Sequence, residues 1–159
     1  MSFKIRKGKN ADMLQVLSLI KELAVFEKEP DAVIITEKTL QKHGFGKNPL
    51  FKIFVAEMSG EIVGMALFYF RYSTWKGPTL HLEDLIVKED KRRLGIGKAL
   101  YNKVLKYAYK KNLKRVEWVV LDWNKPAIDF YKKSGAKILP NWRTVQMDEN
   151  SLKNYIENN

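Results

Sequence analysis

The chain of 159 residues has a composition that fits a folded domain and excludes general disorder. Hydrophobic residues make up 45% of it, which is enough for a sizeable core. The longest apolar runs, such as residues 62–70, are far shorter than a membrane-spanning helix. We therefore expect a soluble protein with a single domain over residues 1–159.

The chain carries a formal net charge of +11, from 29 Lys and Arg against 18 Asp and Glu. Such a surplus favours anionic partners, and nucleic acids are one class of them. The densest basic stretches are residues 88–98, 103–115 and 125–137, and the middle one follows a helical repeat whose charges form a solvated face. No recognised nucleic-acid-binding module accompanies the charge. A solvated face is therefore favoured over a nucleic-acid surface, and it would also attract an anionic cofactor.

The sequence has no cysteine, which excludes disulfides and thiolate nucleophiles and fits a reducing compartment. Residues 1–7 include basic positions but no apolar segment or small-residue cleavage site, so we identify no export signal. We expect a cytoplasmic protein.

The first 45 residues predict one strand and two helices. Residues 3–7 alternate like a strand, and Asn10 is expected to cap a helix whose apolar residues recur every three or four positions until Pro30. Thr36 is expected to cap a second, short helix that ends near residues 43–44.

The middle of the chain predicts three strands and a helix. Residues 51–57 and 62–72 are expected to form an antiparallel hairpin with a tight turn at residues 59–60. Residues 79–87 predict the next strand. Residues 95–111 then form a strongly amphipathic helix.

The last 45 residues predict an alternation of strands and helices. Residues 115–121 are expected to form a buried strand, and Pro126 and Gly135 to bound a helix. Residues 142–147 predict the last strand, and residues 150–159 a short helix. This order of elements indicates an α/β or α+β fold built on a mixed sheet.

A glycine turn between a strand and a helix is the most informative segment. Gly95 and Gly97 leave room for a ligand, and the first N–H groups of the helix attract an anion. Arg92, Arg93 and Lys98 would surround a pyrophosphate there. The alternative is that the glycines only make a tight connection. The pattern is neither a Walker loop nor a dinucleotide fingerprint.

At these residues the sequence resembles the GNAT superfamily of N-acetyltransferases, whose R/Q-x-x-G-x-G/A signature is matched by residues 92–97. Within that superfamily it is similar to the diamine (spermidine/spermine) and thialysine N-acetyltransferases, over nearly the whole chain. The further matches are Ile20-Lys21-Glu22-Leu23-Ala24, Gly44-Phe45-Gly46, Tyr72-Ser73-Thr74-Trp75-Lys76-Gly77, Leu82-Glu83-Asp84, Leu121-Asp122-Trp123-Asn124 and Phe130-Tyr131-Lys132. The resemblance implies a GNAT-type fold, in which helices flank a mostly antiparallel sheet with a splayed parallel strand pair.

The resemblance also implies a cofactor, acetyl-CoA, used as a cosubstrate without a metal. His43 and His81 lack the spacing of a metal-binding pair. The residues expected at the cofactor are Leu85, Ile86 and Val87 for the pantetheine arm, Arg92, Arg93, Leu94, Gly95, Ile96, Gly97 and Lys98 for the pyrophosphate, and Asn124, Lys125, Pro126 and Ala127 on the other side. Strands 82–87 and 116–121 should splay apart to leave a slot for the thioester.

Two residues are expected to act as catalysts by the same resemblance. Tyr131 should give its proton to the departing CoA thiolate, because a phenol with a pKa of about 10 is protonated at neutral pH. The alternative is a core tyrosine beside Phe130. Glu83 should accept the proton of the amine, directly or through water, unless it is only a solvent-facing carboxylate. Asp84 should point to the opposite face in a regular strand, although a bulge would alter that.

The residues expected at the acceptor amine are Phe26, Glu27, Glu83, Asp84 and Trp142. The acidic segment at Glu27 could instead be a solvated turn, and Trp142 could be a buried tryptophan or part of a dimer interface. Ser18 departs from the family, because an arginine is expected there in the animal enzymes, and this leaves the acceptor open.

The function expected is transfer of an acetyl group to a primary amine of a small molecule, by direct attack in a ternary complex. A polyamine, thialysine or a lysine-like amine is the favoured acceptor. The alternatives are a protein lysine acetyltransferase and a basic module that binds CoA or nucleic acid without turnover. The resemblance suggests a homodimer, and we expect no membrane partner.

Overall fold

The computed structural model describes residues 2–158 and divides into two compact units, Met1–Val119 and Val120–Asn159. The single domain expected over the whole chain stays a prediction.

The first unit is built on a five-stranded sheet in which the strands lie in chain order. The strands are β1 (Lys4–Lys7), β2 (Lys52–Met58), β3 (Glu61–Ser73), β4 (Gly77–Val87) and β5 (Val116–Glu117). The first four pair antiparallel, and β5 runs parallel to β4. The tight turn of the β2–β3 hairpin has positive φ angles at Ser59 (51°) and Gly60 (81°), as such turns require. The predicted hairpin and mixed sheet are therefore confirmed.

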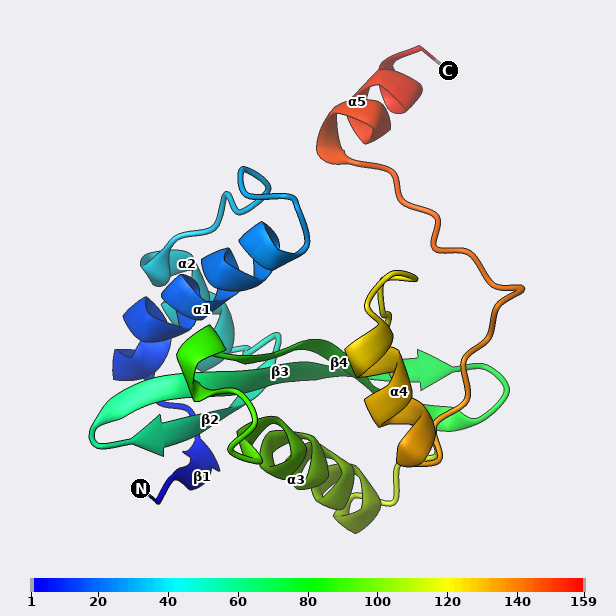
Figure 1. Cartoon of the computed structure of the whole chain (residues 1–159). Helices are drawn as coiled ribbons and strands as arrows, with labels where there is room; N and C mark the ends of the chain where they lie inside the picture. The colour runs from blue at the N-terminus through cyan, green and yellow to red at the C-terminus, as the bar shows by residue number, and fades with distance from the viewer. Residues whose placement is uncertain (1, 159) are drawn as a thin grey trace. The chain divides into compact units, whose positions relative to one another are not determined.

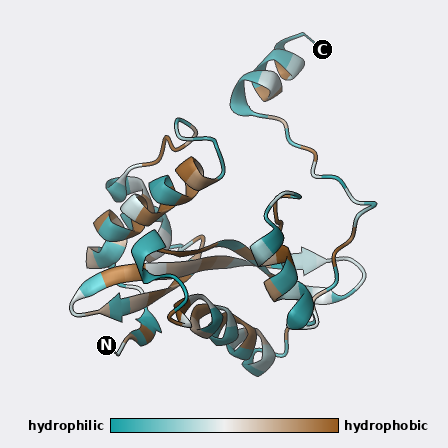
Figure 2. Cartoon of the chain, viewed as in Figure 1, coloured by the Kyte–Doolittle hydropathy of each residue, from teal (hydrophilic) through white to brown (hydrophobic). Residues whose placement is uncertain are grey.

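Helices cover both faces of this sheet (Figure 1). They are α1 (Met13–Phe26) and α2 (Glu37–Phe45) on one face and α3 (Ile96–Lys110) on the other, with two 3-10 turns, η1 (Asn10–Asp12) and η2 (Glu89–Lys91). Met13, Val16 and Leu19 of α1 are fully buried in a core cluster with Val55 and Met65 of the sheet. Figure 2 shows hydrophobic residues along the central strands, while the helices carry both hydrophobic and hydrophilic faces.

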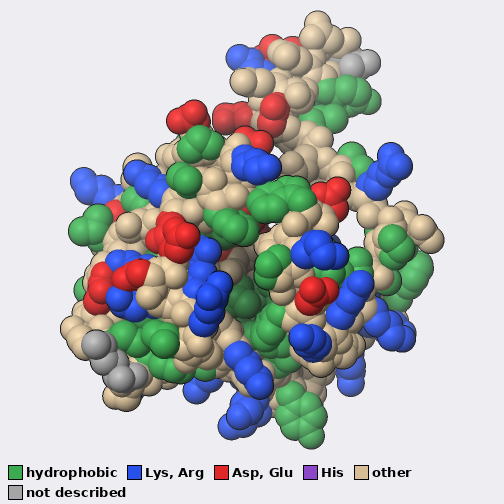
Figure 3. Space-filling view, viewed as in Figure 1, with side chains coloured by type: hydrophobic (Ala, Val, Ile, Leu, Met, Phe, Trp, Pro, Cys, Tyr) green, Lys and Arg blue, Asp and Glu red, His purple; other side chains and the backbone are tan. Residues whose placement is uncertain are grey.

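The α3 helix confirms the predicted amphipathic pattern. Ile96, Leu100 and Val104 are buried. Its basic residues at Lys98, Lys103, Lys106 and Lys110 are exposed. This part of the basic surplus is a solvated face, and Figure 3 shows Asp and Glu side chains among the Lys and Arg on the face in view.

The two predicted caps of the first helices differ in outcome. Thr36 accepts a hydrogen bond from the Thr39 N–H at 3.2 Å, as expected of a cap. The cap expected at Asn10 is wrong, because this residue lies within η1. The buried Asp12 instead accepts from the Lys9 N–H at 2.7 Å and is held by Arg6, so a strand-to-helix ion pair fixes the start of α1.

The buried strand expected over residues 115–121 is wrong in its extent. β5 contains only Val116–Glu117, which pair with Leu80 and His81 and are half-buried. Val119 is 68% exposed. From Leu82 to Val87 no strand among residues 2–158 pairs with this edge of β4, which fits the expected splaying of the two strands.

The second unit contains α4 (Lys125–Lys133) and α5 (Glu149–Glu157). Asn124 caps α4 by accepting from the Ala127 N–H at 3.3 Å, Pro126 lies in the first turn, and Gly135 has a φ of 90° just after the helix. The predicted helices near both ends of this unit are therefore confirmed.

The strand predicted over residues 142–147 is wrong, because this segment has no regular secondary structure. It contains the β-formers Trp142, Thr144 and Val145, but an extended segment becomes a strand only when a neighbouring strand takes up its backbone hydrogen bonds. Among the described residues, none does so.

Residues 2–158 include no helix with the length and apolarity that crossing a membrane requires.

Candidate active site

A β-bulge in β4 shapes the site. Leu82 lies opposite Phe68 of β3, whereas Asp84 lies opposite Leu67, so Glu83 is an extra residue in the ladder. An insertion of this kind bends the strand and redirects the side chains around it.

Glu83 and Asp84 lie on the same face of the sheet, the one that α1 covers. The Tyr69 hydroxyl donates a hydrogen bond to Glu83 Oε2 at 2.8 Å, and Tyr69 shares its face of β3 with Leu67. Asp84 lies directly opposite Leu67, which packs in the core cluster with Met13 of α1. Opposite faces, expected for a regular strand, are therefore wrong for this bulged one.

Three carboxylates form an acidic group beside the end of α1. Burial raises the pKa of Asp84 to about 6, and the neighbouring charges of Glu83 and Glu27 add to the rise. Burial also raises the pKa of Glu27, the residue that follows α1. When carboxylates lie close together in a partly buried site, a nearby cation offsets their mutual repulsion and stabilises their ionised forms. The group is therefore suited to an ammonium group.

Tyr69 was not identified from the sequence. Burial and the hydrogen bond to Glu83 raise the pKa of Tyr69 to about 12, so its hydroxyl stays protonated and keeps donating to the carboxylate. Polar side chains at alternate positions of two otherwise apolar strands, 69 and 71, then 81 and 83, are the signal that could have found it.

The backbone of β4 presents hydrogen-bonding groups beyond the bulge. The Lys88 N–H donates to the Val63 carbonyl at 2.9 Å, and hydrogen-bonded pairs alternate along an antiparallel ladder. The backbone N–H and C=O groups of Ile86 therefore bond to β3. Those of Leu85 and Val87 point away from β3, toward the edge of β4 that β5 leaves unpaired. The expected pantetheine contact fits Leu85 and Val87, and Ile86 supports that edge from within.

The glycine turn presents the bare N-terminus of α3. Gly95 has a φ of 81° and precedes the helix, whose start no side chain caps. Arg93 has a φ of 65°, and both Arg93 and Lys98 are exposed. Ile96 turns its side chain into the core while Leu94 stays half exposed. The expected anion site therefore has N–H groups and two cationic side chains around it.

Packing within the protein does not require glycine at position 97. A methyl group on Gly97 would meet Val87 Cγ2 at 3.7 Å, an ordinary contact. A small residue there, glycine or alanine in the signature, leaves the helix N-terminus uncovered, which favours a ligand over the alternative of a tight connection alone.

Arg92 connects the glycine turn to β4 and α1. Its Nε donates to the Val87 carbonyl at 3.1 Å, and its guanidinium lies 5.6 Å from the centre of the Phe26 ring. Glu22 of α1 accepts from the Glu89 N–H at 3.0 Å and lies 4.0 Å from Arg92. Arg92 therefore holds the turn at the expected pyrophosphate site, and Phe26 lies next to it.

The remaining predicted residues belong to the second unit. They are Asn124, Lys125, Pro126 and Ala127 at the start of α4, Tyr131 within it, and Trp142 in the irregular segment that follows. The Tyr131 ring packs against Phe130, with centroids 5.4 Å apart, and its carbonyl accepts from Ser134 Oγ at 2.7 Å. Their joining with Glu83 in one site stays a prediction.

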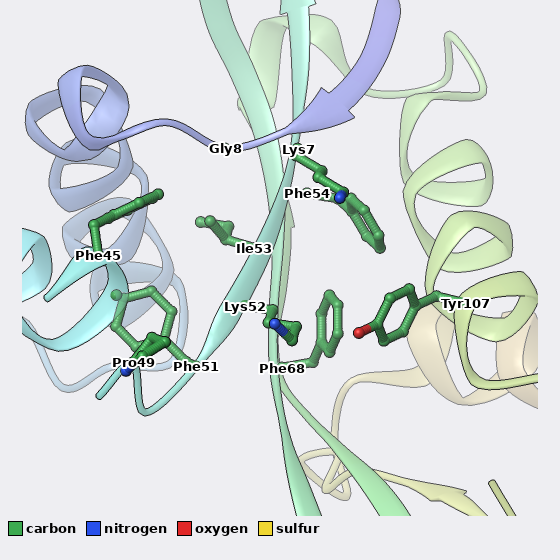
Figure 4. A pocket seen from close by; sticks show the side chains of 11 residues that line it. Lys7, Gly8, Phe45, Pro49, Phe51, Lys52, Ile53, Phe54, Phe68 and Tyr107 are labelled. Carbon is green, nitrogen blue, oxygen red and sulfur yellow. The ribbon is translucent and has the colours of Figure 1, made fainter. Parts of the chain in front are cut away.

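An apolar pocket elsewhere in the first unit contains none of the predicted site residues (Figure 4). Phe54, Phe68 and Tyr107 pack together at one side of it, with Phe54 to Phe68 and Phe68 to Tyr107 centroid distances of 5.2 and 5.3 Å. It offers no carboxylate or glycine turn for the expected chemistry. Among residues 2–158 no cluster of His, Asp and Glu is suited to a metal ion.

Comparisons with known proteins agree with this geometry. Residues 14–136 match the Acetyltransferase (GNAT) family. Thialysine N-epsilon-acetyltransferase of Sus scrofa is 40% identical, over 96% of each chain. Spermidine/spermine N(1)-acetyltransferase-like protein 1 of Homo sapiens is 37% identical, over 84% of this chain and 20% of the human one.

The fold is also found in solved structures. An integron cassette protein from the mobile metagenome of V. cholerae superposes with a TM-score of 0.81 at 22% identity, over 99% of each chain. The resemblance first indicated by residues 92–97 is confirmed, and the chain belongs to the GNAT family of acetyltransferases.

Proposed function

We propose that this protein transfers the acetyl group of acetyl-CoA to a primary amine of a polyamine, thialysine or a similar lysine-like molecule. The observation that carries the proposal is the β4 bulge, which turns Glu83 and Asp84 to one face just before the open edge of the strand. The same strand leads through the short turn η2 into the glycine turn, so the amine site and the cofactor site lie close together in the chain.

Acetyl-CoA would bind along this edge as an added strand. Leu85 and Val87 offer backbone groups to the amides of the pantetheine arm. The pyrophosphate would bind the N-terminus of α3, where Arg93 and Lys98 add positive charge. Asn124 to Ala127 are proposed to complete the cofactor site.

Glu83 would act as the base for the incoming amine. An alkylammonium has a pKa of about 10.4 and must lose a proton before its nitrogen can attack. Glu83, held by the Tyr69 hydroxyl, would take that proton directly or through water. The amine nitrogen then bonds to the thioester carbonyl carbon, and the C–S bond breaks as the intermediate collapses. Tyr131 would protonate the departing thiolate, and the second proton lost by the nitrogen would pass through solvent to reprotonate Tyr131, which yields the N-acetyl amide and free CoA.

The acidic group favours an acceptor with a second positive charge. Glu27 and Asp84 have raised pKa values, and an ammonium group at the far end of the acceptor would offset the repulsion between the carboxylates. The relatives named for thialysine and for spermidine or spermine support this class of acceptor. Ser18, in place of the expected arginine, leaves the choice within the class to experiment. A homodimer and a cytoplasmic location also stay proposals.

A thiol-release assay tests the proposal. Acetyl-CoA would be combined with spermidine, spermine, putrescine, thialysine, lysine and aminoglycosides, and acetyl-CoA binding would be measured alone. We expect turnover with a diamine or a lysine-like amine. Cofactor binding without turnover on any of these amines would contradict the proposed acceptor class.

Glu83→Gln tests the base. We expect activity to fall at neutral pH and to recover in part at higher pH, where more of the amine is already neutral. Glu157→Gln in α5 is a matched control that should behave like the unaltered protein. An unchanged pH profile in Glu83→Gln would show that Glu83 is not the base.

A further inference from the structure

A row of charged and polar side chains crosses three strands next to Glu83. Arg71 of β3 places Nη1 3.2 Å from His81 Nδ1 of β4 and 2.6 Å from Glu117 Oε1 of β5. Arg115 Nε lies 2.7 Å from the other oxygen of Glu117. The row therefore fixes the Arg71 guanidinium between an imidazole and a carboxylate.

The arrangement selects one tautomer of His81. A guanidinium only donates hydrogen bonds, so the ring nitrogen that faces it, Nδ1, must be the acceptor. A neutral His81 then carries its proton on Nε2, which lies 3.5 Å from Glu83 Oε2. The Tyr69 ring packs on the imidazole, with centroids 5.2 Å apart and planes inclined by 32°, and limits its rotation.

Glu83 is consequently held by one of its two oxygens. Oε2 accepts from the Tyr69 hydroxyl and faces the Nε2 side of His81. Among the described residues no side chain donates to Oε1, which leaves this oxygen for the acceptor amine or a water.

We propose that His81 is a positioning residue for Glu83, oriented by Arg71 as the neutral tautomer with its proton on Nε2. This inference rests on the proposed role of Glu83 as the base. The Tyr69 hydroxyl donates to Oε2, and the Nε2–H of His81, 3.5 Å away, would restrain the same oxygen while Oε1 takes the proton from the amine.

The positioning role also requires that His81 be uncharged. Its neighbours are Arg71 and Tyr69 from β3, Glu83 from β4, and Glu117 from β5. Burial lowers the pKa of His81, and the Arg71 charge lowers it further against the opposing effects of Glu83 and Glu117. A protonated His81 would pair with the Glu83 carboxylate and weaken it as a base. Burial, with Arg71 acting in the same direction, favours the neutral imidazole and so keeps the carboxylate basic.

Nitrogen NMR of the whole protein tests the tautomer without any assay of activity. The chain has two histidines, His43 and His81, so His43→Gln assigns both signals. We expect His81 at pH 7.5 as the neutral ring with its proton on Nε2. Arg71→Met, which keeps the stem and removes the guanidinium, should raise the pKa of His81 and mix the tautomers. A proton on Nδ1 in the unaltered protein, or no change in Arg71→Met, would overturn the inference.

Kinetics tests the positioning role. His81→Leu should lower kcat by about tenfold to a hundredfold, as expected for a displaced base, with little change in the KM for acetyl-CoA. His81→Gln places an amide N–H near the position of Nε2 and should restore most of the rate. The exposed His43, changed to Gln, is the matched control. Equal losses in His81→Leu and His81→Gln would overturn the role in positioning Glu83.

The outcomes also separate this inference from the proposed function. If Glu83→Gln abolishes turnover while His81→Leu keeps both kcat and the pH profile, the base stands and the positioning role fails. If Glu83→Gln is fully active, the proposed base fails, and the positioning role fails with it whatever tautomer NMR finds. Thermal unfolding of each variant identifies losses that come from misfolding.

Discussion

Replacing Asp84 by asparagine should stabilise the protein at neutral pH and weaken its use of diamines. Burial raises the pKa of Asp84 from 3.8 to about 6, with contributions from Glu83 and Glu27. One pKa unit corresponds to about 1.36 kcal/mol, so the ionised carboxylate lowers the free energy of unfolding by about 3 kcal/mol when both states are ionised. Asparagine keeps the size of the side chain and removes the charge.

The pH dependence follows from the direction of this shift. The folded protein binds the Asp84 proton more tightly than the unfolded chain does, so the cost is absent below the unfolded pKa of 3.8 and is complete above the folded pKa of about 6. Asp84→Asn should therefore gain about 3 kcal/mol at pH 8 and almost nothing near pH 4.

Denaturant unfolding at both pH values, with the exposed Asp31→Asn as a control, measures the gain. The thiol-release assay should show a raised KM for the diamine in Asp84→Asn. A variant that is less stable than the unaltered protein at pH 8, or equally stabilised at pH 4, would refute the reasoning.

Three further substitutions test the strand, the turn and the proposed acid. Gly64→Ala should lose about 1 to 3 kcal/mol of stability, because its methyl group would lie 2.9 Å from the Ile86 carbonyl oxygen and 3.3 Å from Leu100 Cδ1; an unchanged melting temperature would contradict this. Gly97→Glu should weaken acetyl-CoA binding in a titration by at least about tenfold if the helix N-terminus holds the pyrophosphate, because the added carboxylate would repel it, while Gly97→Ala, which the R/Q-x-x-G-x-G/A signature admits, should keep both the binding and the melting temperature. Tyr131→Phe should bind acetyl-CoA normally and lose most turnover in the thiol-release assay, and full activity would remove Tyr131 from the mechanism.

Local patterns were enough to predict most elements of the fold. The hairpin turn at Ser59-Gly60, the cap at Thr36 and the apolar face of α3 depend on neighbours in sequence, and the structure contains all of them. The strands expected over residues 115–121 and 142–147 failed because strand formation depends on a distant partner, which no local pattern supplies.

The candidate site was predictable in its residue types and less so in its geometry. The glycine turn marked the anion site, but the bulge that brings Glu83 and Asp84 to one face depends on the register between β3 and β4. Tyr69 and His81 contact Glu83 only because of that register. A lone histidine without metal spacing gave no reason to connect it with the base.

The two edges of the sheet differ in their tendency to pair with other chains. β1, at one edge, has only four residues, and its end residues Lys4 and Lys7 are exposed. A short, charged strand resists pairing with a second sheet, since lysine ammonium groups would have to be brought together and stripped of water. Growth of the sheet into aggregates is thus disfavoured on this side, and strand addition is left to the part of β4 beyond His81.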